Sequence, residues 1–463
     1  MSHQDKKVEC RFQADDLKAT LRWLFADLSW VAISFRADCS WTPALLASAA
    51  LLWSWLDEST LVERFQSARS IIMFLFPGQQ ELAGSYQAFM KMLRRWTAPL
   101  VGLLQASLQG RLGSALPEHW AVGGLVAFGV DGSRIDLPRT EPNEQAYAAS
   151  RHGKKAKKRG GKSRRRKDSR KADSPQMWLT TMLHLGTGLP WDWRTGPADS
   201  SERAHMLEML PGLPQGAMVL ADAGFVGYEY ARAIADGGRS LLIRVGANVR
   251  LIRKLGVARE SAGTVYLWPN DQARRNRPPL VLRLISAHKN GRPVHLLTSV
   301  LDARQLSDRQ AVELYRHRWG VELFYRHLKQ TFERRKLRST SPRNAEIEMQ
   351  WSYLALGMMG LYALVEAAKE GVSPHRLSVA QMLRAFRRTL RDYRHPLVRG
   401  KRLCHRLRAA IIDSYVRQNK TSRNYPRKKQ GSPPGSPTIT IASDAQVQRA
   451  RLLDSPAKKR LTA

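Results

Sequence analysis

Hydrophobic residues recur at helical spacing over the first part of the chain. Between about residues 15 and 109, apolar side chains return every three or four positions, as in Leu17, Leu21, Leu24 and Phe25, and again in Leu61, Phe65, Ile71 and Ile72. This period is typical of helices that bury one face. We therefore predict a helical N-terminal domain over residues 1–115.

The pattern changes after a segment rich in Gly and Pro at residues 110–124. Short apolar runs bounded by Gly, Pro or charged residues follow at 125–130, 178–184, 217–221 and 240–245. Such runs predict buried strands of a mixed or parallel sheet, and helical spacing at 201–210 places a helix among them. Residues 248–300 then alternate as strands do, with candidates at 264–268, 280–286 and 293–300, and predict a β-rich insertion. The expected fold class is therefore α/β, and we expect residues 116–340 to form the catalytic domain.

The last third of the chain returns to helical spacing and then loses its pattern. We expect a helical region over residues 341–420 and a disordered basic tail over residues 421–463, where prolines and cations dominate. The longest apolar runs, at 43–56 and 351–365, are shorter than the ~20 residues of a membrane span. No apolar signal segment opens the chain, and Cys10, Cys39 and Cys404 form no paired motif. These features predict a cytoplasmic protein without a membrane partner.

The net charge of the chain indicates the class of its binding partner. The 463 residues include 76 Lys and Arg against 39 Asp and Glu, a formal net charge of +37. A surplus of this size favours a polyanionic partner, nucleic acid first, with membrane surfaces and acidic proteins as weaker alternatives. Residues 151–171 hold 13 cations and almost nothing apolar, which predicts a basic loop. This loop is either a solvated segment or, as we favour, a DNA contact; its candidate residues are Lys154, Lys155, Arg164 and Arg165.

A polar stripe marks one of the later helices. In the segment YRHRWGVELFYRHLK, helical geometry places four polar residues on one narrow face: Tyr315, Arg318, Glu322 and Lys329. An adjacent apolar face carries Val321, Phe324, Leu328 and Phe332. The pattern indicates a helix docked on a core with its polar row at the edge of the contact. The alternative is a solvated basic face with an incidental Glu.

Two aspartates change that balance. Asp131 and Asp222 each follow an apolar strand-like run, where a turn-forming role is the simple alternative. Together with Glu322 they offer three carboxylates that could converge on Mg²⁺ or Mn²⁺, the hard cations that prefer oxygen ligands. Such a site suits two-metal phosphodiester chemistry, with Arg318 and Lys329 available for the phosphate backbone.

These residues carry a family resemblance. The spacing Tyr315-x2-Arg318-x3-Glu322-x6-Lys329 matches the Tyr-Arg-Glu-Lys signature of a group of bacterial insertion-sequence DDE transposases. The blocks VDGSRIDLP around Asp131 and ADAGFVG around Asp222 resemble the two aspartate motifs of the same group. The resemblance covers about residues 125–336. It implies an RNase H-like core, a mixed sheet flanked by helices, with a β-rich insertion between the second Asp and the Glu.

The resemblance also implies the roles of the site residues. Asp131, Asp222 and Glu322 would hold two divalent ions, Mg²⁺ or Mn²⁺, for hydrolysis at the element end and for attack of the freed 3′-hydroxyl on target DNA. Tyr315, Arg318 and Lys329 would contact phosphates near the cleaved end. The implied partners are double-stranded DNA, as transposon ends and target, and a second copy of the chain in a synaptic homodimer. The implied place is the nucleoid, and the N-terminal helices would bind DNA.

Several matters stay open at this stage. Some relatives place a Trp before the Leu-Leu-Thr-Ser strand, where this sequence has Val294 and His295, so the cleavage intermediate is undecided. Trp268 offers a stacking face or, more simply, a half-buried strand aromatic. Trp319 and Gly320 are expected to pack, and His184 and His205 to be structural.

Three other functions compete with the transposase reading. A nuclease of the same fold would cut DNA without strand transfer. A transposase-derived DNA-binding protein would have lost its chemistry, but an intact acidic triad counts against it. RNA binding by charge alone predicts no such triad.

Overall fold

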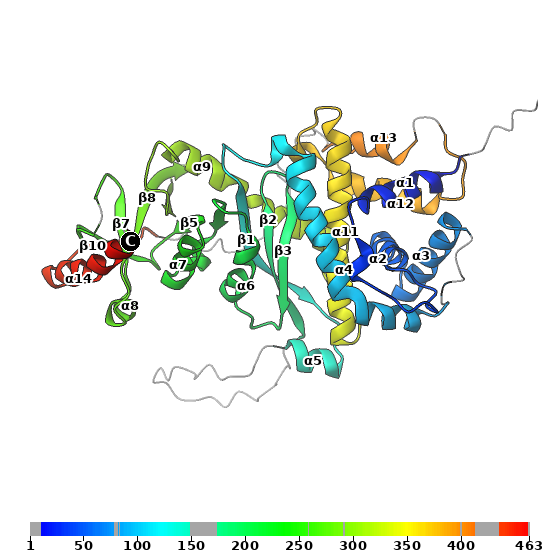
Figure 1. The fold of residues 1–463 in the computed structure, drawn as a ribbon, viewed down its shortest axis with the longest axis horizontal. Helices are drawn as coiled ribbons and strands as arrows, with labels where there is room; N and C mark the ends of the chain where they lie inside the picture. Colours follow the sequence, from blue (N-terminus) through cyan, green and yellow to red (C-terminus); the bar gives the residue numbers. More distant parts are fainter. Residues whose placement is uncertain are drawn as a thin grey trace, which may run out of the picture.

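A sheet of ten strands runs along the molecule and connects its two ends (Figure 1). The computed structural model describes residues 11–77, 82, 84–148, 174–257, 259–289, 292–398, 401–412 and 435–461. Neighbouring strands follow the order β10-β6-β7-β8-β9-β5-β4-β1-β2-β3. The β-rich part lies at one end of the molecule, most helices lie at the other, and the strands that carry the candidate site lie between them.

Five of these strands form the core: β1 (Ala127–Asp136), β2 (Gln176–His184), β3 (Leu189–Gly196), β4 (Met218–Ala221) and β5 (Ser240–Val245). The first three pair antiparallel, and β4 and β5 add in parallel beside β1. The helix α6 (Glu202–Met209) connects β3 to β4, and α7 (Tyr228–Asp236) connects β4 to β5. All four residues of β4 are buried, as expected for a strand covered on both faces. This is the RNase H-like core that the resemblance implied.

The helical end combines segments from both ends of the sequence. Its members are α1 (Gln13–Leu24), α2 (Pro43–Trp55), α3 (Leu61–Leu75), α4 (Tyr86–Ala115), α11 (Pro342–Ala368), α12 (Val379–Arg391) and α13 (Leu403–Arg408). The helices α4 and α11 lie side by side against β3. By length and composition α11 could cross a membrane, but 83% of its most apolar stretch is buried inside the protein, as in the central helix of a core. Short elements complete the chain: α5 (Glu141–Tyr147) and 3₁₀ turns at Trp30–Ala32, Pro117–His119, Leu210–Gly212, Ala223–Phe225 and Pro374–Arg376.

The β-rich insertion extends the core sheet directly. It contains β6 (Arg250–Arg253), β7 (Thr264–Leu267), α8 (Asn270–Arg274), β8 (Leu280–Lys289) and β9 (Arg292–Thr298). The strand β9 pairs with β5 from Leu242↔Thr298 to Val245↔His295, so the hydrogen-bond ladder continues from the core into the insertion. The chain then enters α9 (Asp308–His317), α10 (Trp319–Arg326) and a π-helical segment, His327–Thr331.

The prediction of a disordered tail is wrong for residues 435–461. There the chain forms β10 (Thr438–Ile441), which pairs in parallel with β6, and α14 (Asp444–Leu461). The sequence Thr-Ile-Thr-Ile is β-branched throughout and suits a strand, and β6 offers it a free edge. Residues 421–434 of the expected tail, and residues 413–420 at the end of the expected helical region, lie outside the described residues.

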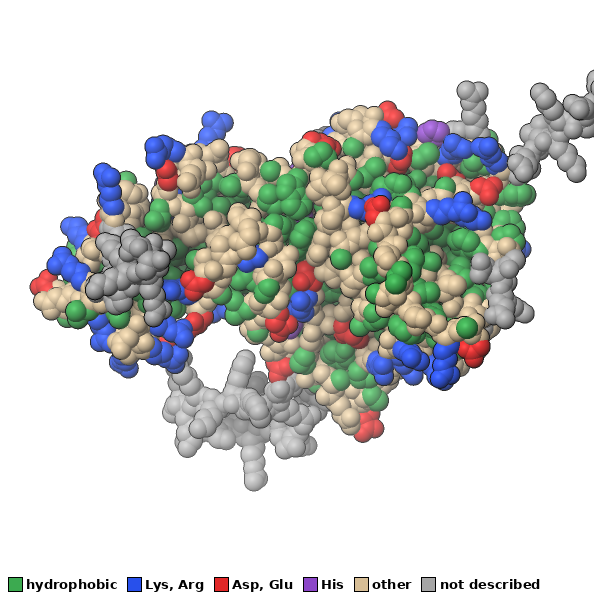
Figure 2. Space-filling model, viewed as in Figure 1, with side chains coloured by type: hydrophobic (Ala, Val, Ile, Leu, Met, Phe, Trp, Pro, Cys, Tyr) green, Lys and Arg blue, Asp and Glu red, His purple; other side chains and the backbone are tan. Residues whose placement is uncertain are grey.

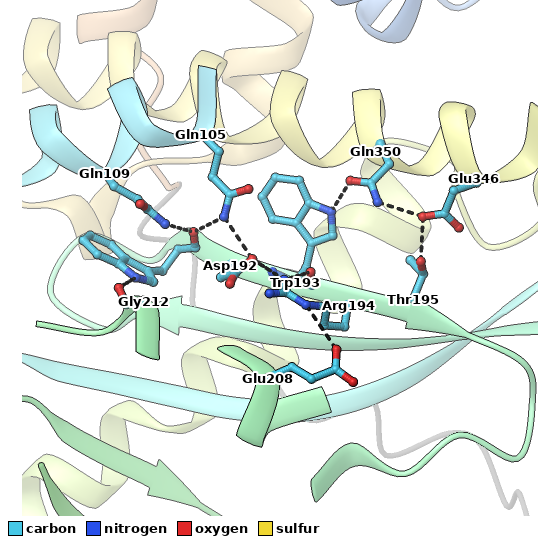
Figure 3. Close-up of polar contacts among 11 residues, drawn as sticks. Gln105, Gln109, Asp192, Trp193, Arg194, Thr195, Glu208, Gly212, Glu346 and Gln350 are labelled. Atoms are coloured by element: carbon cyan, nitrogen blue, oxygen red, sulfur yellow. Dashed lines mark hydrogen bonds and ion pairs between the residues drawn. The ribbon is translucent and has the colours of Figure 1, made fainter. Parts of the chain in front are cut away.

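At the opposite edge of the sheet, helix side chains satisfy polar groups of β3 (Figure 3). The pairing of β2 with β3 shifts register at Met182/Leu183 and leaves Trp191 as an extra residue. The amides of Gln105 and Gln109, one turn apart on α4, donate to the Trp191 carbonyl at 3.0 and 2.8 Å. Further along β3, Trp193 donates to Gln350 of α11. The bulge that interrupts the ladder is therefore paired by α4, which fixes the helical end to the core.

Candidate active site

Asp131 lies in the middle of β1, so the prediction that it ends a strand is wrong. The strand continues to Asp136 because β2 pairs with it throughout, from Phe128↔His184 to Asp136↔Gln176. The apolar run stops at Val130 because the side chains of the candidate site begin at Asp131. The backbone hydrogen bonds between β1 and β2 nevertheless continue to Asp136. The Gly132 amide donates to Asp131 Oδ1 at 2.8 Å and holds this carboxylate near the backbone.

Asp222 follows β4 directly, as the sequence predicts. Its Oδ1 accepts a hydrogen bond of 2.7 Å from the Gly224 amide and caps the turn Ala223–Phe225. Because β4 is parallel to β1 with Gly129 opposite Leu220, Asp131 and Asp222 each lie two residues beyond that pair. The two aspartates therefore stand at the same level on neighbouring strands.

The third acid comes from the helical segment, which is not the single helix that its periodicity predicts. The segment α9 ends at His317, Arg318 connects it to α10, and the last turn is π-helical. Glu322 lies in the first turn of α10, where its Oε1 is 2.5 Å from Nη2 of Arg318. The other nitrogen, Nη1, is 3.6 Å from Oδ2 of Asp131. One guanidinium thus stands between two of the predicted acids.

Tyr315 and Lys329 reach the same two strands. The Tyr315 hydroxyl donates to the Ala221 carbonyl at 3.2 Å, one residue before Asp222. The Lys329 ammonium donates to Ser133 Oγ at 2.7 Å, two residues after Asp131. Burial raises the pKa of Tyr315 to about 12 and lowers that of Lys329. Tyr315, Arg318 and Lys329 therefore contact the segments that carry the two aspartates, and Glu322 is linked to Asp131 through Arg318.

The negative charges of Asp131, Asp222 and Glu322 are only partly balanced by the positive charge of Arg318. Burial, and then the neighbouring charges of Asp222 and Glu322, raise the pKa of Asp131 to about 6, against the opposing effects of the Gly132 amide and Arg318. Among the described residues, no three Asp, Glu, His or Cys side chains are arranged closely enough to hold a metal ion. Carboxylates that are partly buried and crowded are nevertheless the donor set that hard divalent cations bind. In this arrangement Arg318 supplies the positive charge.

A fourth acid, Glu202, was missed by the sequence analysis. It begins α6, and its carboxylate lies so close to Gly132 that a Cβ on that residue would overlap it. Burial, followed by the charges of Asp131 and Asp222, raises the pKa of Glu202 to about 7. No motif marks it, because an acid in the first turn of a helix is ordinarily explained by the helix dipole.

Two expectations about aromatic residues have opposite outcomes. Trp319 is 57% exposed next to Arg318, so the expectation that it packs in the core is wrong. It begins α10 on the side away from buried Val321. Trp268 packs as the simpler interpretation expects, but it lies directly after β7 and is fully buried, and its indole donates to the Arg277 carbonyl.

The remaining candidates are histidines and the basic loop. His184 is buried and bonded to Thr187 and to the Trp120 carbonyl, and His205 to Thr180, so both are structural as expected. Lys154, Lys155, Arg164 and Arg165 lie outside the described residues.

Comparison with known proteins identifies relatives of the region that holds the site. A family model described as a transposase DDE domain matches residues 125–358, half of the chain. The chain is 29% identical over 275 residues to the transposase InsG for insertion sequence element IS4 of Escherichia coli (strain K12), a match that covers 57% of this chain and 58% of that protein. It also aligns with a cryo-EM structure of the piggyBac transposase synaptic complex with hairpin DNA, at a TM-score of 0.39 and 11% identity over 90% of this chain and 87% of that one. This last likeness is too distant to support an argument about the site.

Proposed function

Because the chain belongs to the transposase DDE domain family, we propose that it is an insertion-sequence transposase, which binds the ends of its element and cuts and transfers DNA strands. The observation that best supports this proposal is the position of Arg318 between Asp131 and Glu322. Asp222 directly follows the neighbouring strand β4, at the same level as Asp131. An acid of β1 and an acid of α10 thus contact a single cation.

Asp131, Asp222 and Glu322 are the residues that would hold divalent ions, and we propose Mg²⁺ or Mn²⁺, two per site. Bound there, such ions activate the attacking oxygen and stabilise the leaving oxygen of a phosphodiester. The chain's own contribution is to hold the three carboxylates at fixed positions, since each is tied to a strand or to Arg318.

The cations of the site are suited to bind the DNA backbone. Arg318 and Lys329 lie on either side of Glu322 in sequence, and Tyr315 adds a hydroxyl beside Asp222. Guanidinium and ammonium groups bind phosphate oxygens by charge-assisted hydrogen bonds. We assign these three residues to the phosphates near the cleaved end. Lys154, Lys155, Arg164 and Arg165 are proposed as further DNA contacts, and a homodimer as the form that holds two ends.

The test is cleavage of a labelled duplex that carries one end of the element with flanking DNA, in Mg²⁺ and in EDTA. We expect nicking at the element boundary that needs the metal and falls at least 1,000-fold, roughly the loss of a transition-state contact or more, in Asp131→Asn and in Glu322→Gln. Glu208→Gln is the matched control, because Glu208 lies on α6 and pairs with Arg194 away from the acids. Full cleavage by either site variant would refute the assignment.

A second assay separates the competing functions. Joining of the labelled end to a target plasmid is expected of a transposase, whereas cutting without joining indicates a nuclease of the same fold. Salt-sensitive binding without cutting by the unchanged protein indicates a DNA-binding protein that has lost its chemistry.

A further inference from the structure

We propose that Glu202 is a fourth metal-binding carboxylate of this active site, acting beside Asp131 and Asp222; the inference rests on the proposed function. Three features support it: the position of α6, the contacts of its first turn, and a Glu202 carboxylate that makes no hydrogen bond or ion pair with the described residues.

The helix α6 presents Glu202 to the sheet. Ser201 caps the helix by accepting a hydrogen bond from the Ala204 amide, which fixes where the first turn begins. Met206 and Met209 are the buried residues of α6, four and seven positions after Glu202. Residues at these spacings share one helix face, so Glu202 lies on the side that packs against the sheet.

The first turn of α6 contacts both aspartate segments. Glu202 lies against Gly132, whose amide donates to Asp131 Oδ1. The next residue, Arg203, donates from Nε and Nη2 to the Gly224 carbonyl at 2.9 and 2.5 Å. The Gly224 amide in turn donates to Asp222 Oδ1. Two consecutive residues of α6 thus contact the two segments, Glu202 at the residue after Asp131 and Arg203 at Gly224.

The carboxylate of Glu202 has no hydrogen bond or ion pair within the described chain. The side chain is half-buried, and its carboxylate lies against β1 at Gly132, the residue after Asp131. A half-buried carboxylate beside two like charges destabilises the protein unless a cation joins them. A role limited to the helix dipole would not require the side chain to lie against β1. The arrangement therefore favours a carboxylate held ready for a divalent cation.

The experiment measures Mn²⁺ binding by the full-length protein without DNA, using isothermal titration calorimetry and the electron paramagnetic resonance signal of free Mn²⁺. We expect Glu202→Gln to weaken Mn²⁺ binding about tenfold or more, in the range found when groups around a metal site are removed. Glu208→Gln makes the same change on the same helix and is expected to bind Mn²⁺ as the unchanged protein does. Asp131→Asn serves as the positive control for loss of binding.

Thermal unfolding gives a second measure that does not depend on cleavage. Removing a like charge is expected to leave Glu202→Gln at least as stable as the unchanged protein in metal-free buffer, while it gains less in Tm from added Mn²⁺. If this variant fails to fold, Glu202→Asp replaces it; the shorter side chain keeps the charge and is expected to retain part of the affinity.

The outcomes separate the two proposals. If Asp131→Asn loses Mn²⁺ binding while folded Glu202→Gln, or Glu202→Asp in its place, binds Mn²⁺ as tightly as the unchanged protein, the inference about Glu202 is overturned and the proposed function stands. If the unchanged protein binds no Mn²⁺, or if Asp131→Asn binds it normally, both are overturned.

Discussion

The Arg318 guanidinium interacts with two carboxylates, and these interactions would compete with its binding to a phosphate. Nη2 bonds Glu322, whereas Nη1 is 3.6 Å from the Asp131 carboxylate. Nη1 is buried and has no hydrogen-bond partner among the described residues. An incompletely paired guanidinium in a half-buried site is unfavourable, and a phosphate oxygen would complete its pairing. The residue is thus suited to exchange carboxylate for phosphate, which accords with the DNA-binding role proposed for it.

His184 predicts how stability depends on pH. Burial lowers the pKa of His184 to about 4, and its Nε2 donates to the Trp120 carbonyl while Nδ1 accepts from Thr187. Because the unfolded chain binds the proton more readily, this contribution to stability is full above about pH 6.5 and is lost as the pH falls towards 4. Between pH 7 and 5 the loss from this group is about 2 kcal/mol.

The measurement is urea unfolding at pH 7 and pH 5. His184→Gln can still donate to Trp120, and we expect it to show a smaller drop in the free energy of unfolding than the unchanged protein. His288→Gln, at an exposed position, is the control and should follow the unchanged protein. Equal pH dependence of all three would contradict the assignment.

Among single residues, the sequence predicts the site residues that belong to one local pattern. The row Tyr315, Arg318, Glu322 and Lys329 is set by helical spacing, and the structure brings it to the two aspartate segments. Glu202 and the exposure of Trp319 depend instead on how α6 and α10 meet the sheet. No spacing along the chain encodes such contacts.

Among the elements, the approach of α10 to β1 depends on Gly129. A Cβ at this position would stand 2.6 Å from Val321 Cγ2 and 2.9 Å from Leu185 Cδ2, so Gly129→Ala must push α10 away from the strand. We expect a loss of about 1–3 kcal/mol in the free energy of unfolding. End cleavage should fall about 100-fold, since Glu322 moves away from Asp131 with the helix.

The control for this change is Gly102→Ala in α4. A Cβ there meets nothing within 4 Å, so the variant is expected to gain about 1 kcal/mol of stability, as alanine does over glycine in a helix, with unchanged cleavage. Cleavage by Gly129→Ala at the normal rate would show that the close approach of α10 is unimportant.

Element types were easier to predict than element ends. The strands β1, β2, β4 and β5 and the insertion were predicted from short apolar or alternating runs, which buried strands leave in the sequence. The strand β3 was missed, because its sequence LPWDWRTG mixes apolar and polar residues. The break at Arg318 and the π-helical turn at His327–Thr331 were not visible, since both result from hydrogen bonds that local composition does not determine. The extension of β1 beyond Asp131 likewise depends on its partner β2.

For the whole molecule, charge predicts a strong effect of salt on DNA binding. Figure 2 shows Lys and Arg side chains gathered over the β-rich end, and Arg250, Arg253 and Lys254 are exposed there. If 6–10 phosphates are neutralised, raising salt from 50 to 200 mM should weaken binding roughly 10³- to 10⁵-fold. Fluorescence anisotropy with a labelled duplex measures this slope.

One substitution at the β-rich end sharpens the test. Arg253→Gln is expected to reduce the salt slope by about one ion if this residue binds a phosphate. Arg232→Gln is the control, because Arg232 is already paired with Asp236 on α7. An unchanged slope in Arg253→Gln would remove the β-rich end from the DNA-binding surface.

The arrangement of the two ends around the core could not be predicted from the sequence. Apolar periodicity identifies helices but not the partner of each, and the pairing of α4 with α11 joins residues about 250 positions apart. The strand β10 was not predicted for the same reason, because a four-residue strand is stable only when it pairs with a neighbouring strand, here β6.

The parallel pairing of β10 with β6 has a consequence for the order in which the protein is made. Thr438 follows Arg253 by about 185 residues, which a ribosome at roughly 5–20 residues per second takes about 10–40 s to add. Through that interval the edge of β6 stands without its neighbour while the core can already fold. An unpaired edge of this kind recruits other strands, so the nascent insertion is open to wrong pairing until β10 emerges.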